Sequence, residues 1–180
     1  MPHTSSLPNL LSASRFLLAG LMFWAVMTGS WYLAVSFLWL AVGTDTLDGY
    51  LARKIDATSP LGGLLDHSSD ACFVTLTITA LTFHGWAPIP LAIIIPAAFM
   101  QYMLDSKSLA GQPLRASHLG RYNGIAYYVF AGFPIMQLTL NITLIPFDWF
   151  YYIGWGLVLT SLISMMDRLI TLLSQRTVDH

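Results

Sequence analysis

Four aspartates are the residues of this chain whose type and spacing best suit chemistry. On a helix, Asp45 and Asp48 lie about 60° apart and Asp66 and Asp70 about 40° apart, so each pair shares one face. Seven charged residues of the 180-residue chain fall between Asp45 and Asp70. Charge within an apolar membrane segment is costly and therefore indicates a functional site. We expect the two pairs to meet across a helical hairpin.

A cluster of four carboxylates predicts bound divalent cations. The carboxylates repel one another in a low-dielectric site unless cations neutralise them. Oxygen ligands without His or Cys in register favour Mg²⁺ or Mn²⁺ over Zn²⁺, and two such ions would balance four aspartates. A two-metal carboxylate centre suits phosphoryl transfer. The alternative is that these aspartates cap helices or pair with Arg53 and Lys54, which explains one aspartate more readily than four.

The composition predicts that the elements carrying these residues span a membrane. The chain is 56% hydrophobic and 9% charged, whereas a soluble domain is about 25% charged. A bilayer core needs roughly 20 apolar residues per helix, and lipid cannot satisfy a free backbone. We therefore expect an all-α integral membrane protein of six transmembrane helices, forming a single domain over residues 1–180. The expected segments are 10–28, 31–52, 61–83, 88–104, 119–141 and 148–173.

The distribution of charge predicts the orientation and excludes one class of partner. All eight Lys and Arg residues fall at the same set of segment ends, which by the positive-inside rule places both termini in the cytoplasm. The opposite ends carry Trp31, Trp86 and Trp149, as in an aromatic belt. Residues 1–14 contain no Lys or Arg, so we interpret the first segment as a retained span rather than a signal peptide. A net charge of -1 provides no basic field for a nucleic acid.

Small residues and an arginine accompany the acidic pairs. Gly49 and Ala52 keep the helix surface low enough for a nucleotide, Gly62 removes a side chain opposite, and Arg53 offers a donor fork for phosphate or ribose. The pattern Asp45-x2-Asp48-Gly49-x2-Ala52-Arg53-x8-Gly62-x3-Asp66-x3-Asp70 resembles the complete signature of the CDP-alcohol phosphatidyltransferase family. The segment Pro8-Asn9-Leu10-Leu11-Ser12-x2-Arg15 is similar to the N-terminal segment of bacterial phosphatidylglycerophosphate synthases.

The resemblance implies a metal-dependent enzyme, commonly homodimeric, in the bacterial inner membrane with its active site facing the cytoplasm. Asp45, Asp48 and Asp66 would bind one cation, Asp66 and Asp70 the second, and Asp70 would also be the general base. The alcohol that Asp70 deprotonates would attack the phosphorus distal to cytidine in CDP-diacylglycerol and release CMP. Asn9 and Arg15 are further candidate site residues by the same resemblance. The CDP moiety would contact Asp48, Gly49, Ala52, Arg53 and Gly62.

The acceptor is less clear from the sequence. Basic residues around the fourth connection are candidates to bind the phosphate of an acceptor such as glycerol 3-phosphate, or they form a positive-inside loop against anionic lipid. They are Lys107, Arg115, His118 and Arg121. The run Ser117-His118-Leu119-Gly120-Arg121 resembles the Ser-x-Leu-Gly-Lys of phosphatidylglycerophosphate synthases.

One feature of the motif favours a different reaction. Asp66-His67 resembles choline and ethanolamine phosphotransferases, in which a CDP-alcohol donates to diacylglycerol. There His67 would either assist proton transfer or only hydrogen-bond at the membrane interface. A small ion-coupled transporter is a further alternative, but transport predicts polar groups near several span midpoints, and here they gather at span ends.

Overall fold

The computed structural model describes residues 6–54, 60–105 and 118–178, which form six α-helices. All six predicted segments are confirmed as helices, within a few residues at each end. The helices are α1 (Ser6–Met27), α2 (Trp31–Lys54), α3 (Pro60–Phe83), α4 (Ile89–Asp105), α5 (His118–Thr139) and α6 (Phe147–Val178).

Two glycines set where α1 and α3 end. Gly29 and Gly85 have φ values of 68° and 76°, a left-handed conformation that glycine adopts without steric cost. Ser30 N donates to Ala25 O and Gly29 N to Val26 O, and the same pair of bonds closes α3 around Gly85. This double bond pattern is a Schellman cap. Only residues 28–30 therefore connect α1 to α2, and only residues 84–88 connect α3 to α4.

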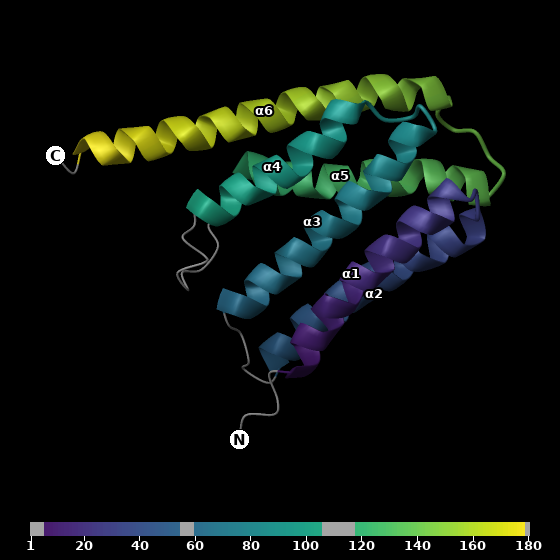
Figure 1. Cartoon of the computed structure of the whole chain (residues 1–180), viewed down its shortest axis with the longest axis horizontal. Helices are drawn as coiled ribbons and strands as arrows, with labels where there is room; N and C mark the ends of the chain where they lie inside the picture. Colours follow the sequence, from purple (N-terminus) through teal and green to yellow (C-terminus); the bar gives the residue numbers. More distant parts are fainter. Residues whose placement is uncertain (1–5, 55–59, 106–117, 179–180) are drawn as a thin grey trace.

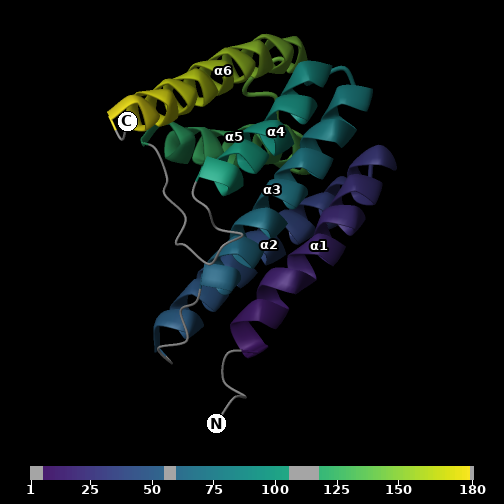
Figure 2. The same ribbon diagram turned by 60° about the vertical axis from the view of Figure 1, so that its left-hand side comes forward.

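The helices spread like a fan (Figure 1). The short turns after α1 and α3 and the α5–α6 connection lie at the closed end of the fan, and both chain termini lie at the open end (Figures 1 and 2). α1 packs against both α2 and α3, α3 also contacts α4 and α5, and α6 covers α4 and α5. Over the described residues the backbones of α2 and α3 make few direct contacts, although the two helices are consecutive in the chain. α1 lies between them instead.

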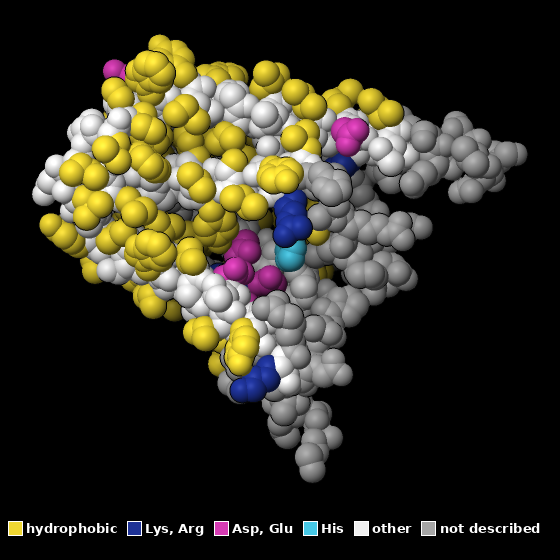
Figure 3. All heavy atoms as spheres, turned by 180° about the vertical axis from the view of Figure 1, so that it is seen from behind, with side chains coloured by type: hydrophobic (Ala, Val, Ile, Leu, Met, Phe, Trp, Pro, Cys, Tyr) yellow, Lys and Arg dark blue, Asp and Glu magenta, His cyan; other side chains and the backbone are white. Residues whose placement is uncertain are grey.

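Two helices are long and apolar enough to cross a membrane by length and composition, over Leu10–Met27 and Phe147–Thr171. The apolar stretch of α4, Ile89–Leu104, is shorter. Large apolar side chains cover much of the outer face (Figure 3). These observations agree with a helical membrane protein, whereas six spans and cytoplasmic termini stay predictions.

Close helix contacts and an aromatic cluster fix the closed end. A Cβ at Gly132 would lie 2.9 Å from Leu38 Cδ2, and a Cβ at Gly154 would lie 2.4 Å from Pro88 Cδ. The contact between α2 and α5 and the contact of α6 with the residue before α4 therefore depend on glycine having no side chain. His84 and Trp86 stack with centroids 4.7 Å apart, and Trp86 lies 4.6 Å from Phe147. The open end, where the aspartates lie, is therefore the less tightly packed part of the fan.

Candidate active site

The four aspartates gather around one arginine at the open end. Arg15 projects from α1, and its side chain is 0% exposed. Its Nη1 donates to Asp45 and Asp70, at 3.1 Å for Asp45 Oδ1, while Nη2 donates to Asp48 and Asp66, at 2.5 Å for Asp66 Oδ1. Each terminal nitrogen thus joins one carboxylate of α2 to one of α3. The expectation that the two pairs meet is confirmed, and α1 supplies the group through which they meet.

Burial differs among the four carboxylates. The side chain of Asp48 is 5% exposed, whereas those of Asp45, Asp66 and Asp70 are 48%, 27% and 29% exposed. The buried Asp48 also accepts a 3.0 Å hydrogen bond from Ser12 Oγ of α1. A buried carboxylate needs this kind of pairing because its desolvation is costly. Asp48 is therefore the most enclosed of the four carboxylates, and the other three are partly exposed.

The carboxylates fit a divalent cation. Oxygen atoms of Asp45, Asp48 and Asp66 all lie within 4.8 Å of one another, a spacing that one hard ion coordinated by oxygens can bridge. Arg15 contributes one positive charge against four carboxylates, so the centre keeps a negative charge that attracts cations. Asp70 is not part of that three-residue set. The metal-ligand assignments stay predictions.

Asp70 has two donors on the same oxygen. Tyr128 Oη of α5 donates to Asp70 Oδ1 at 2.9 Å, and Arg15 Nη1 donates to the same atom. Two donors on Oδ1 fix the rotation of the carboxylate, which a general base requires because it must lie within hydrogen-bond reach of its proton. Tyr128 stacks on the buried Phe73, with centroids 6.0 Å apart, so its hydroxyl is itself held in place.

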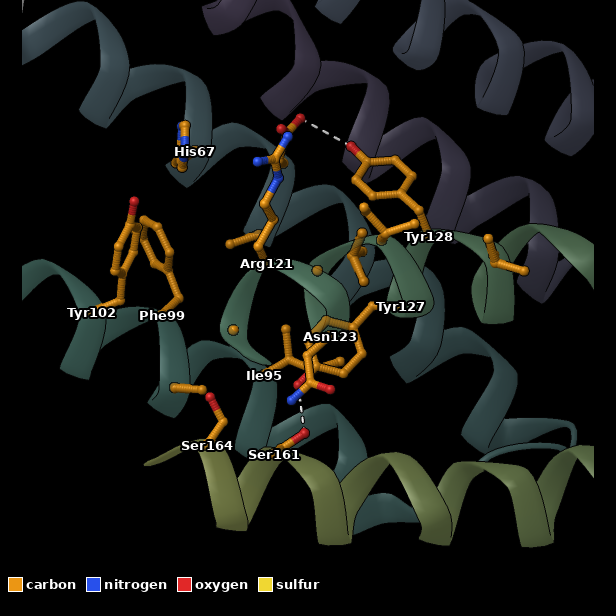
Figure 4. A pocket seen from close by; sticks show the side chains of 18 of the residues that line it. His67, Ile95, Phe99, Tyr102, Arg121, Asn123, Tyr127, Tyr128, Ser161 and Ser164 are labelled. Carbon is orange, nitrogen blue, oxygen red and sulfur yellow. Dashed lines mark hydrogen bonds between the residues drawn. The ribbon is translucent and has the colours of Figure 1, made fainter. Parts of the chain in front are cut away.

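A cavity of about 870 Å³ opens beside these residues. Asp45, Asp66 and Asp70 line it together with a second group of residues from α4, α5 and α6, several of which are labelled in Figure 4. The second group includes Phe99, Tyr102, Arg121, Asn123, Ser161, Ser164 and Arg168. Figure 3 shows acidic, histidine and basic side chains gathered around a hollow on this face. The volume lies within the range of roughly 300–1,000 Å³ that is typical of small-molecule sites.

His67 and Arg121, both predicted from the sequence, line the cavity. The His67 side chain is 49% exposed and its Nδ1 lies 3.6 Å from Asp66 Oδ2, so it faces the acidic wall at its rim. Arg121 projects from the first turn of α5 (Figure 4). Lys54, one of the alternative partners of the aspartates, lies instead over the Tyr50 ring, with its Nζ 5.7 Å from the centroid.

Among the residues predicted to contact CDP, the described Asp48, Gly49 and Gly62 do not line this cavity. Asp48 turns inward to Arg15, and Gly49 and Gly62 lie on α2 and α3 outside the cavity wall. The side chains of Asn9, Ala52, Arg53 and His118 are outside the described part of the structure, although helices contain these positions. Lys107 and Arg115 lie outside the described residues altogether. The CDP contacts therefore stay predictions.

Sequence reasoning missed most of the other cavity residues, among them Tyr102, Tyr128 and Arg168. A signal for Tyr128 was available, because it follows Arg121 by seven residues and two helical turns return to nearly the same face. Arg168 was interpreted only as a marker of topology or a partner of Asp167. Its guanidinium carbon lies 4.8 Å from the centroid of the Tyr102 ring, a contact between α6 and α4 that no local pattern in the sequence predicts.

Fold and site together define a helical protein whose acidic centre fits a cation and lies beside a cavity that basic residues also line. The chain belongs to the CDP-alcohol phosphatidyltransferase family, whose model matches residues 5–169. The resemblance inferred from the aspartate motif is thus confirmed.

Named relatives fall into two groups. The chain is 36% identical over 96 residues to CDP-diacylglycerol–glycerol-3-phosphate 3-phosphatidyltransferase of Pseudomonas fluorescens, which is 50% of this chain and 49% of that enzyme. It is 28% identical over 170 residues to the CMP-forming cardiolipin synthase of Streptomyces coelicolor, covering 86% and 77% of the two chains. A glycerol-3-phosphate phosphatidyltransferase of Shigella flexneri is 24% identical, with 97% and 96% covered. The match to the P. fluorescens enzyme thus spans about half its length.

Proposed function

We propose that this protein transfers a phosphatidyl group from CDP-diacylglycerol to a small alcohol, releasing CMP, in phospholipid synthesis. The observation that carries the proposal is the convergence of Asp45, Asp48, Asp66 and Asp70 on one point beside a cavity. Family membership and the printed names of the relatives above support the same reaction. The relative from P. fluorescens makes glycerol 3-phosphate the first acceptor to test.

The residues have distinct roles in this proposal. Asp45, Asp48 and Asp66 would hold one Mg²⁺ or Mn²⁺, and Asp66 with Asp70 would hold a second; such cations would neutralise the phosphates of the donor. Asp70 accepts the proton of the acceptor hydroxyl. The acceptor oxygen then forms a bond to the phosphorus distal to cytidine, and the bond from that phosphorus to the bridging oxygen breaks, so that CMP leaves.

The protein's environment is part of the same proposal. We place the open end of the fan, with the aspartates and both termini, on the cytoplasmic side of a bacterial inner membrane. The positive-inside rule supports this because the basic residues gather at these helix ends. Family resemblance supports a homodimer.

The experiment is release of CMP from CDP-diacylglycerol by the purified full chain in Mg²⁺ or Mn²⁺, with candidate alcohols offered singly and products identified by mass. Asp66→Asn removes a cation ligand, and we expect activity to fall by at least about a hundredfold. Asp148→Asn is the matched control, because Asp148 lies in the first turn of α6 at the other end. Normal turnover of Asp66→Asn would contradict the proposal, and product formed only from a CDP-alcohol and diacylglycerol would favour the alternative reaction.

A further inference from the structure

Asp70 of α3 is held by two other helices at a single oxygen. Tyr128 Oη of α5 donates to Asp70 Oδ1 at 2.9 Å, the bond drawn dashed at Tyr128 in Figure 4, and Arg15 Nη1 of α1 donates to the same atom. Within the part of the chain that the structure describes, no donor is bonded to Asp70 Oδ2. The Asp70 side chain is partly exposed and lines the cavity. Oδ2 is therefore the oxygen with which Asp70 can accept a proton from a ligand.

The Tyr128 side chain meets α3 at two points. Phe73 follows Asp70 by three residues, so both side chains lie on one face of α3. The ring of Tyr128 stacks on the buried Phe73, with centroids 6.0 Å apart and planes 13° apart, while its hydroxyl reaches Asp70. The ring contact thus places the hydroxyl, and the hydroxyl orients the carboxylate. Tyr128 also lines the cavity, so a ligand bound there would meet a carboxylate whose orientation is already set.

The two donors on Asp70 Oδ1 differ in charge. Arg15 is a cation whose guanidinium is shared among all four carboxylates. A divalent ion held by these carboxylates would repel the guanidinium and compete with it for their oxygens. The hydroxyl of Tyr128 is neutral and meets no such repulsion. Tyr128 is therefore the donor that can hold Asp70 in one orientation whether or not the carboxylates bind cations.

We propose that Tyr128 is the positioning residue of the general base: its hydroxyl holds Asp70 Oδ1, and Asp70 Oδ2 takes the proton of the acceptor hydroxyl. That proton moves to Oδ2, the acceptor oxygen bonds to phosphorus, and the electron pair of the breaking bond leaves with CMP. Tyr128 keeps its own proton throughout. Because a base must be aligned with the proton that it takes, losing the Tyr128 hydroxyl slows the reaction without weakening substrate binding. The inference rests on the proposed function, in which Asp70 is the base.

The first test separates turnover from binding. Tyr128→Phe keeps the ring on Phe73 and removes only the hydroxyl. We expect kcat for CMP release to fall about tenfold, with the KM values for CDP-diacylglycerol and glycerol 3-phosphate changed less than about twofold, because a hydrogen bond to a charged group is lost in the step that uses it. Mn²⁺ titrated into the purified variant without substrates should bind as tightly as to the wild type, because the hydroxyl is not a cation ligand in this proposal.

The second test asks whether Tyr128 acts through Asp70. In a double-mutant cycle, two residues that act as a unit are not additive. Tyr128→Phe should therefore lower the residual kcat of Asp70→Asn by less than about twofold, whereas it lowers that of the wild type about tenfold. A merely structural effect of losing the hydroxyl would lower kcat by the same factor in both backgrounds. The Tm of each variant shows that it is folded at the assay temperature.

Tyr122→Phe is the matched control. Tyr122 lies on the same helix, its side chain is 68% exposed, and it does not line the cavity. Removing its hydroxyl should leave kcat and both KM values unchanged.

The outcomes separate this inference from the proposed function. A wild type that releases CMP, with a Tyr128→Phe variant of equal kcat, would overturn the positioning role and leave phosphatidyl transfer intact. Equal losses of kcat in the two backgrounds, or weaker Mn²⁺ binding by Tyr128→Phe, would also overturn it. A wild type that releases no CMP with any acceptor would contradict the proposed function itself.

Discussion

Arg15 is the residue that partly neutralises the four carboxylates of the acidic centre before any cation binds. It is buried, and its two terminal nitrogens contact all four carboxylates. Arg15→Met keeps the bulk of the side chain and removes the charge. Because three of the carboxylates are partly exposed, we expect a loss of about 2–3 kcal/mol in the free energy of unfolding in EDTA, less than the roughly 3–5 kcal/mol for breaking a fully buried pair.

The measurement is thermal unfolding of the purified protein in EDTA and again in Mn²⁺. Cations can take over part of the neutralising role, so Mn²⁺ should raise the Tm of Arg15→Met more than that of the wild type. Arg121→Met serves as the control, because Arg121 is exposed and its loss should leave the Tm in EDTA almost unchanged. An Arg15→Met protein as stable as wild type in EDTA would show that the pairing contributes nothing to stability.

At the level of elements, helical periodicity predicted which residues share a face but not which helices are neighbours. The spacing of Asp66 and Asp70 placed both on one face of α3, and the structure agrees. The same reasoning expected the carboxylate pairs of α2 and α3 to meet across a hairpin, and it said nothing of a third helix. α1 lies between them and contributes Arg15. Helical periodicity within one segment carries no information about which other helix packs against it. Arg168 was underestimated for the same reason, since its partner Tyr102 belongs to another helix.

The glycines show the same limit of sequence reasoning, and one of them provides a prediction about the packing of helices. Gly43, Gly132, Gly154 and Gly156 all look suited to close helix contact, yet a Cβ at Gly43 or Gly156 would meet nothing within 4 Å. Gly154→Ala would place its Cβ 2.4 Å from Pro88 Cδ, and a proline ring cannot rotate away. We expect it to destabilise the protein by about 1–3 kcal/mol, as overpacking does.

Gly156→Ala is the matched control for this substitution, two residues along the same helix. It should be neutral or stabilising by up to about 1 kcal/mol, because alanine favours a helix more than glycine does. Unfolding midpoints of both variants, measured in the same detergent, test the pair. Equal stability of the two variants would show that α6 does not approach Pro88 as closely as the structure has it.

Over the whole molecule, the close packing contacts and the residues proposed for catalysis lie at different ends of the fan. The closed end holds the Schellman caps and an aromatic cluster from three connections, in which His84 lies 5.5 Å from Trp31 and Trp86 lies between His84 and Phe147. His84 Nε2 also lies 3.0 Å from Val26 O at the end of α1. The open end holds Arg15, the carboxylates and the cavity. The helices are thus packed closely at one end and spread apart at the end that holds the proposed site.

This separation predicts the effect of removing the centre of the aromatic cluster. Trp86→Ala should lower the free energy of unfolding by about 2–3 kcal/mol, less than the roughly 3–5 kcal/mol of a fully buried tryptophan, because Trp86 is half-buried. At a temperature where the variant is folded, its kcat and both KM values should equal those of the wild type, because none of the residues of the cluster lines the cavity. Trp149→Ala, with a side chain 62% exposed on the first turn of α6, should change neither quantity. A Trp86→Ala protein that stays folded but loses turnover would show that packing at the closed end sets the geometry of the four carboxylates.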